Sequence, residues 1–234
     1  MREPHSRFGF ASRRVFIFLT RLRARDWAQR SGSVEKVAYE SETAPGTGSM
    51  FDQIRTDTFA IGTNNEVTFE SSIADGRSGL FSDSGGLLHA IALTDTPASD
   101  SGDATISNIV RWTANDLGQV AFMAQLDGPG FPDVIFATDR NGVLHRIIGQ
   151  GDTIEVAPGD LGQIEFLNFM GLDGSFGMSG TNVTSGFDND GQIAFSATLM
   201  DGDFNDTSGV FVTTVPEPSL DGDYNHDGIV DAAD

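Results

Sequence analysis

The amino-acid sequence predicts an all-β protein built from repeated units of about four short strands. Three observations favour this fold class. Short apolar segments that end in phenylalanine recur along the chain, Asn, Asp and Gly residues of the kind that form turns separate them, and lysine occurs only once, at Lys36. This composition is typical of short strands joined by tight turns rather than of long surface helices. With 234 residues, the chain is long enough to bury a core.

The first 33 residues differ from the rest of the chain in charge. Eight of the fourteen basic residues are arginines within the first thirty positions, whereas Asp and Glu dominate the remainder and bring the net charge to −20. We interpret residues 1–33 as a basic disordered leader, a defective signal segment or a wrongly assigned start. Residues 12–17 resemble a twin-arginine export signal, but Arg21, Arg23 and Arg25 interrupt the apolar stretch that such a signal needs.

An eight-residue motif recurs three times in the body of the chain, which we place at residues 34–214. Each copy combines turn-forming residues with a short apolar stretch and closes with phenylalanine, so each predicts a turn followed by a half-buried strand. We expect the closing phenylalanines to lie in the core and the Asn, Asp and Gly residues to form the turns. The copies occupy residues 62–69, 115–122 and 188–195.

The spacing of the copies indicates an insertion. The closing phenylalanines Phe69, Phe122 and Phe195 lie 53 and then 73 residues apart. Residues 171–186 are rich in Gly, Ser and Thr, and a surface loop at this place would account for the longer spacing.

Three further apolar segments accompany each motif, which gives about four strands per unit. Four strands per unit favour the blades of a propeller, although a stacked array of β-sandwiches would give similar spacing. Three units are fewer than the roughly four to eight blades of a typical ring, so the chain is a fragment, forms oligomers or has an open arrangement. The accompanying segments are 79–81, 134–136 and 209–211; 36–39, 89–93 and 145–148; and 50–54, 106–110 and 164–169.

At these motifs the sequence resembles the NxxGxxAF-repeat proteins, which are secreted proteins of planctomycetes and cyanobacteria with such units in tandem. The second copy matches the signature fully through Asn115, Gly118, Ala121 and Phe122, whereas the third copy has Asp188 in the asparagine place. The resemblance covers most of the body and carries no known catalytic chemistry. It implies an extracellular or cell-surface location.

The last twelve residues predict a calcium-binding loop. Counted from Asp223, oxygen-bearing side chains stand at positions 1, 3, 5, 9 and 12, and a glycine stands at position 6. Calcium prefers about six to eight oxygen ligands, and a loop with this spacing supplies them by wrapping around the ion, with a backbone carbonyl at position 7. The predicted ligands are Asp223, Asn225, Asp227, Ile229, Asp231 and Asp234.

The aspartate at position 12, where EF-hands usually carry glutamate, makes residues 223–234 resemble a truncated dockerin type I repeat. In dockerins, paired loops with following helices bind a cohesin module on another protein, so the resemblance implies a cohesin-type partner. The single loop predicts weak calcium affinity. We interpret residues 215–222, which contain Pro216 and Pro218, as a linker; the alternative is the opening of a PEP-CTERM sorting tail.

Composition and motif content disfavour several classes of function. The chain contains no cysteine, which excludes disulfides, zinc-thiolate sites and thiol nucleophiles. Its acidity disfavours nucleic-acid partners, and the apolar run Val15 to Leu19 is far too short for a membrane span. The motifs of serine hydrolases, P-loop enzymes and zinc proteases do not occur. His89 and His145 occupy equivalent places in two units, which favours a structural role.

These observations favour a non-catalytic, secreted β-repeat protein with a calcium-dependent docking element. The alternative is a carbohydrate-active propeller enzyme or accessory subunit that a dockerin recruits to a polysaccharide-degrading assembly. A cluster of carboxylates and aromatic residues at one mouth of the β domain would favour this alternative. Residues 201–206 resemble a partial calcium loop but lack a glycine at position 6, and we expect a hairpin turn there.

Overall fold

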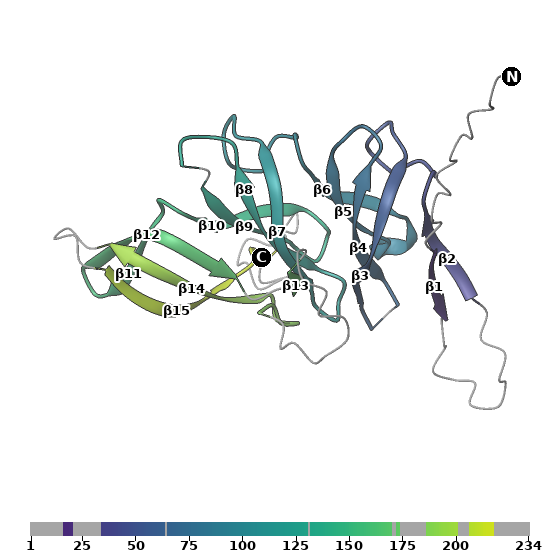
Figure 1. The fold of residues 1–234 in the computed structure, drawn as a ribbon. Coiled ribbons are helices and arrows are strands. Elements are labelled where there is room, and N and C mark those ends of the chain that lie inside the picture. The colour runs from purple at the N-terminus through teal and green to yellow at the C-terminus, as the bar shows by residue number, and fades with distance from the viewer. Residues whose placement is uncertain are drawn as a thin grey trace, which may run out of the picture.

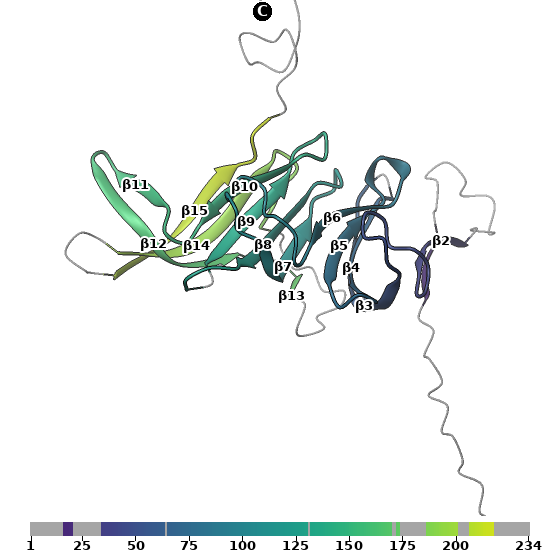
Figure 2. The same cartoon turned by 90° about the horizontal axis from the view of Figure 1, so that it is seen from above.

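The computed structural model describes residues 16–20, 34–63, 65–130, 132–169, 172–173, 186–200 and 206–217. Within these ranges the chain is all β and contains no α-helix; a single 3₁₀ turn, η1, covers Ser84–Gly86. Three antiparallel sheets, of four, five and four strands, follow one another along the chain and lie side by side in an open, propeller-like arrangement (Figures 1 and 2). The predicted fold class is therefore confirmed.

The first two sheets repeat one strand order. Each runs in chain order from its first to its fourth strand, and neighbouring strands are antiparallel. The first sheet contains β3 (Phe51–Ile61), β4 (Val67–Ile73), β5 (Ser78–Ser82) and β6 (His89–Leu93). The second contains β7 (Ile106–Ala114), β8 (Val120–Leu126), β9 (Asp133–Thr138) and β10 (Leu144–Gly149), with the short β13 (Leu172–Asp173) beside β7.

The third sheet contains equivalents of the first three strands of the other sheets, but its fourth strand lies at the opposite edge. Its first strand forms a hairpin with an extra strand, β11, and no described residue pairs with the outer edge of its third strand, where β6 and β10 stand in the other sheets. The sheet order is β11 (Thr153–Ala157), β12 (Asp160–Phe169), β14 (Gln192–Met200) and β15 (Asp206–Thr214). The hairpin predicted at residues 201–206 agrees with the antiparallel pairing of Met200 with Asp206.

Strands β1 (Phe16–Thr20) and β2 (Val34–Tyr39) form a separate antiparallel pair. Their register matches that of β9 and β10: Phe18 pairs with Lys36 as Phe136 pairs with Arg146, and a one-residue shift follows in both pairs. The two strands therefore correspond to the third and fourth strands of a unit. The leader predicted at residues 1–33 thus contains a strand; residues 1–15 and 21–33 lie outside the described residues.

A stacked pair of phenylalanines marks the centre of each sheet. The closing phenylalanine of each motif lies on the second strand, directly opposite a phenylalanine on the third. The ring centroids lie 5.8, 5.3 and 5.6 Å apart in the three sheets, with interplanar angles of 23°, 21° and 28°. All three motif phenylalanines are buried, which confirms the core prediction. The pairs are Phe69 with Phe81, Phe122 with Phe136, and Phe195 with Phe211.

The sheets pack face to face and bury their apolar side chains between them. One cluster joins the first and second sheets and includes Leu80, Trp112 and Phe122. A second cluster joins the second and third sheets and includes Ile135 and Phe195. The second sheet is therefore covered on both faces. A third cluster closes the far face of the first sheet with Val37 and Ala38 of β2 as well as residues of the sheet itself.

Two short strands do not belong to the segments predicted from the sequence. Residues 153–157 form β11 because their β-branched residues extend up to a Pro158-Gly159 turn, where Gly159 takes the left-handed conformation at φ 80°. Within the predicted insertion at 171–186, residues 172–173 form β13. Residues 174–185 lie outside the described residues.

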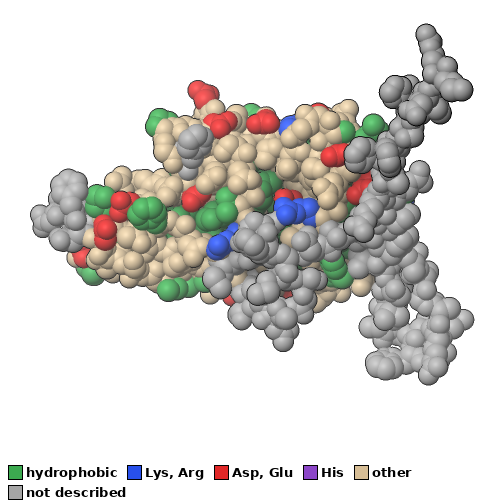
Figure 3. All heavy atoms as spheres, in the orientation of Figure 1, with side chains coloured by type: hydrophobic (Ala, Val, Ile, Leu, Met, Phe, Trp, Pro, Cys, Tyr) green, Lys and Arg blue, Asp and Glu red, His purple; other side chains and the backbone are tan. Residues whose placement is uncertain are grey.

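The third sheet differs from the others in its surface. Hydrophobic side chains lie exposed over this part of the molecule among polar and acidic ones (Figure 3). The exposed large hydrophobic residues of the sheet include Phe166, Val210 and Val212.

Replacing the buried ring of the second sheet should destabilise the fold. Phe122→Ala removes a ring that lies between two sheets and leaves a cavity, and we expect a loss of about 3–5 kcal/mol in the free energy of unfolding. Phe59→Ala, which truncates a partly exposed ring of β3, should cost about 1 kcal/mol or less. Urea denaturation of both variants measures the difference; equal losses would contradict the face-to-face packing.

A carboxyl group at the start of β9 should make stability depend on pH. Burial raises the pKa of Asp133 above its ordinary value of 3.8, and one of its oxygens is buried without a hydrogen-bond partner among the described residues. The folded state therefore binds this proton more tightly than the unfolded state, and the cost of folding with a charged Asp133 grows as the pH rises from 3.8 through the raised pKa.

Asp133→Asn should accordingly stabilise the protein at pH 7 by about 1 kcal/mol. The gain should shrink as the pH falls toward 4, because Asp133 is then protonated in the parent chain. Thermal melts across this pH range provide the measurement, with the exposed Asp160→Asn as the control. A gain that persists undiminished at low pH would refute this explanation.

Candidate functional site

In the second and third copies of the motif, the side chain at the first position holds the turn. Asn115 Oδ1 accepts hydrogen bonds from the backbone N–H groups two and four residues later, at 3.0 and 3.1 Å, and Asp188 Oδ1 accepts the same two bonds at 3.0 and 2.8 Å. The fourth position of each turn has a positive φ, which favours Gly or Asn. The angles there are 66° at Asn65, 79° at Gly118 and 77° at Gly191. The predicted turn chemistry is confirmed.

The three turns are also joined to one another. Both the N–H and the hydroxyl of Thr63 donate to the carbonyl of Asp116, at 2.9 and 2.7 Å. Asn115 Nδ2 donates to the carbonyl of Asp188 at 2.8 Å, and the N–H of Asp116 donates to Asn189 Oδ1 at 3.0 Å. The bonded residues are 53 and 73 apart in sequence, which equals the spacing of the repeat. We call these linked turns at 62–66, 115–119 and 188–192 the turn ladder.

A pocket of about 450 Å³ lies beside the turn ladder, between elements of the first and second sheets. Turns and strand ends that lie far apart in the sequence line it, and its polar side chains include two carboxylates and one guanidinium. The residues that line it include no Phe, Tyr or Trp. Its polar lining residues include Glu66, His89, Gln119, Asp139 and Arg140.

Asp139 is the most thoroughly bonded acid in this pocket. One carboxylate oxygen accepts the N–H groups of Asn141 and Val143 at 2.8 and 2.9 Å, and the other lies 3.2 Å from His145 Nε2. His89, at the equivalent place in the first sheet, has its Nδ1 3.0 Å from the carbonyl of Leu87. Both histidines therefore stabilise local chain geometry, in agreement with the structural role predicted from their repeated positions.

Glu66 differs from its counterparts in the other units. It stands in the place of Gln119, whose Nε2 donates to the carbonyl of Thr138 at 3.2 Å and whose Oε1 accepts from Asn115 at 2.9 Å. A carboxylate cannot donate in this way. Among the described residues, Glu66 Oε2 is buried without a hydrogen-bond partner.

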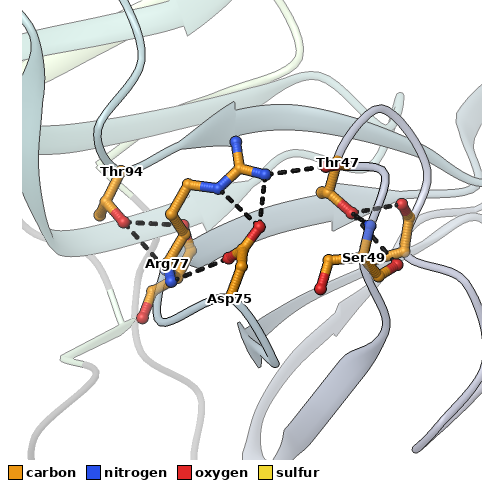
Figure 4. A network of polar contacts seen from close by, with 7 residues as sticks. Thr47, Ser49, Asp75, Arg77 and Thr94 are labelled. Atoms are coloured by element: carbon orange, nitrogen blue, oxygen red, sulfur yellow. Dashed lines mark hydrogen bonds and ion pairs between the residues drawn. The ribbon is translucent and has the colours of Figure 1, made fainter.

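A separate polar network holds the segment before β3 against the first sheet (Figure 4). Arg77 donates from Nε and Nη2 to Asp75 Oδ2 at 3.1 and 2.7 Å, and from Nη2 to the carbonyl of Thr47 at 2.9 Å. The guanidinium beside it lowers the pKa of Asp75. Thr47 in turn accepts the N–H of Ser49 at 3.0 Å, and Thr94 accepts that of Ser78 at 2.9 Å. The network is a structural clamp.

The predicted metal site is not among the described residues. Asp223, Asn225, Asp227, Ile229, Asp231 and Asp234 all lie in residues 218–234, which the structure does not describe. In the described part of the chain, no group of three or more His, Asp and Glu residues could hold a metal ion. That part likewise contains no helix long and apolar enough to cross a membrane.

The sequence does not predict the pocket, because the residues that line it belong to several turns in two units. Its only sequence signals were the Asn141-Gly142 turn and the glutamate at position 66, which departs from the glutamine of the other two copies. Neither signal shows that the two places face each other.

A comparison with protein families gives one match. The model of a family of unknown function (DUF7453) matches residues 19–221. These residues include the three sheets and stop short of the predicted calcium loop. No curated protein and no solved structure matches the chain.

Exchanging the two residues that differ at the turn ladder should change stability in opposite directions. Gln119→Glu removes the donor to Thr138 and should destabilise the protein by about 1–3 kcal/mol, whereas Glu66→Gln should stabilise it by roughly 1 kcal/mol because the buried oxygen is replaced by a group that can donate. Thermal or urea denaturation at neutral pH gives both values. Effects of the same sign would contradict the equivalence of the two positions.

Proposed function

Because the chain belongs to the DUF7453 family, whose description assigns no function, we propose a function from its own residues. It is a non-catalytic β-repeat protein that acts as a scaffold or binding module and is docked through a calcium-dependent loop. The proposal has two parts, one for the body and one for residues 223–234.

The hydrogen bonds of the repeated polar residues support a non-catalytic role for the body. The side chains of the motif cap their own turns and bond to the next turn at the spacing of the repeat. Asp139 and His145, which could otherwise serve acid–base chemistry, are bonded to each other and, through Asp139, to a turn. Side chains committed in this way hold the units in register, as a scaffold requires.

The ligand spacing of residues 223–234 supports the second part. Five oxygen-bearing side chains and one backbone carbonyl at these positions make the donor set that calcium prefers. The chain leading to this loop starts from the body, since Val215 is buried and donates its N–H to the carbonyl of Gly191 at 2.9 Å. Pro216 and Pro218 then favour an extended linker.

The partner that we propose for this loop is a cohesin-type module. An extracellular or cell-surface location follows from that partner and from the resemblance to secreted repeat proteins.

The carbohydrate-active alternative would use the pocket beside the turn ladder. Its carboxylates, Glu66 and Asp139, could bind sugar hydroxyl groups, but its lining lacks the aromatic ring on which a sugar would stack. We therefore favour the non-catalytic function.

Isothermal calorimetry tests the calcium loop directly. We expect calcium to bind the chain with a dissociation constant of about 10⁻⁴–10⁻³ M, as in extracellular modules, and a double variant with Asp223→Ala and Asp227→Ala to lose this binding. A matched double variant with Asp201→Ala and Asp203→Ala has the same change in charge at positions between β14 and β15 in the sequence, and it should bind as the parent chain does. Binding that survives the first variant, or no binding at all, would refute the docking loop.

A further inference from the structure

We propose that the free edge of β15 binds an extended, basic peptide segment of a partner protein, which joins the third sheet as an added strand. The free edge is the side of β15 that faces away from β14, and no described residue pairs with it. β15 lies at the rim of the molecule (Figure 1). The proposal concerns the body of the chain and does not depend on the calcium loop.

The fold covers the corresponding edge in its other units. β6 pairs with the third strand of the first sheet, and β10 pairs with the third strand of the second. The same pairing joins β1 and β2, which correspond to the third and fourth strands of a unit. β15 is the third strand of its own unit. A strand at its free edge would therefore continue a contact that the described part of the chain already contains three times.

The sequence after β15 does not encode the turn that leads into a fourth strand. In the first two sheets a glycine N–H donates to the carbonyl of the residue that directly follows the third strand. The distances are 2.9 Å from Gly86 to Asp83 and 3.0 Å from Gly142 to Asp139. Val215 directly follows β15, and Pro218 stands three positions later, in the place of these glycines. Proline has no N–H to donate, so the chain leaves the free edge to another strand.

Every second residue of β15 directs its backbone groups to the free edge. Val215, next along the chain, donates its N–H to the carbonyl of Gly191 at 2.9 Å. In an antiparallel pair, residues bonded to the neighbouring strand alternate with residues whose N–H and C=O groups point the other way. Counted back from Val215, the residues of the second kind include Ser208, Val210 and Val212. Their groups are the donors and acceptors that an added strand needs.

The free edge also lacks the features that usually protect an unpaired strand. Such strands carry Lys or Pro, or a bulge that disturbs their pairing. Residues 206–214 contain neither Lys nor Pro, and all nine pair with β14 in an unbroken register. Strands β3, β6, β10 and β11, which also lie at sheet edges, each have a shift in their register. β15 therefore has the regular pairing of an inner strand.

The existing fourth strands indicate the chemistry of the partner segment. Lys36 of β2 stands opposite Phe18, and Arg146 of β10 stands opposite Phe136, whereas β6 has an alanine at this place. The same register puts a basic residue of the partner opposite Phe211. The net charge of −20 attracts a basic segment and repels a second copy of the chain. We therefore assign the free edge to a basic segment of another protein.

Fluorescence anisotropy with a synthetic peptide tests the free edge. The probe is a labelled peptide with the sequence of residues 142–150, which include β10. The full chain is titrated into it in a calcium chelator, so that the predicted docking loop makes no contribution. We expect a dissociation constant of about 10–100 μM, because a short strand adds only a few main-chain hydrogen bonds. A peptide with Arg146→Glu should bind several-fold more weakly, because the chain repels its negative charge.

A proline in β15 tests the place of binding. Val210→Pro removes an N–H that points to the free edge, a position at which an edge strand tolerates proline. It should weaken binding of the peptide at least tenfold. Val210→Ala keeps this N–H, and it should bind the peptide within about twofold of the parent chain, because main-chain bonds carry most of the affinity.

Methylated peptides provide a second test in which the protein is unchanged. In β10 the N–H of Gln150 donates to the carbonyl of Asp133 at 2.9 Å, whereas the N–H of Gly149 points away from β9 and donates to Asp152 at 2.8 Å. By alternation the N–H of Ile148 points toward β9. N-methylation of the peptide at Ile148 should abolish binding, and N-methylation at Gly149 should leave it within about twofold.

Three results would overturn the proposal: no binding by the parent chain, binding unaffected by Val210→Pro, or equal binding of the two methylated peptides. Light scattering at the concentrations of the titration supplies a fourth. A mass of twice 25.0 kDa in the absence of peptide, which Val210→Pro returns to that of one copy, would assign the free edge to a second copy instead.

Discussion

The first and second sheets each carry apolar side chains on both faces, and a sheet alone cannot remove either of its faces from water. The stacked phenylalanine pairs at the sheet centres concentrate the apolar surface, so burial of one sheet requires another beside it. The second sheet meets this requirement fully, since its two faces belong to two separate core clusters. The first sheet meets it with the help of Val37 and Ala38, whereas the third leaves one face exposed.

The turn ladder fixes the relative positions of the packed sheets. Apolar packing is not directional. The hydrogen bonds from Thr63 to Asp116 and from Asn115 to Asp188 are directional, and they fix how far each sheet is displaced along its neighbour. The same residues are those of the repeated motif. The motif therefore combines a turn, a strand start, a core ring and a link between units within eight residues.

The sequence predicted the features that depend on local chemistry. Phe122 and its counterparts are buried as expected, and Gly118 and Gly191 stand in left-handed turns. Strand β1 was missed because the arginines around it resemble a leader, although its register with β2 is that of β9 with β10. The pocket depends on how distant turns meet, as do the exposed positions of the third sheet. Val210 has the same local pattern as Ile135, and only the neighbouring sheet distinguishes them.

Because each sheet contacts only the next, stability in this fold is distributed by position along the stack rather than shared by all residues. We expect the amide protons of the second sheet, which is covered on both faces, to exchange most slowly, whereas the mostly exposed strand β11 at the far end can detach first. Unfolding under heat or force would then proceed from the third sheet inward. A chain organised in this way can gain or lose a terminal unit during evolution without rebuilding the packing of the others.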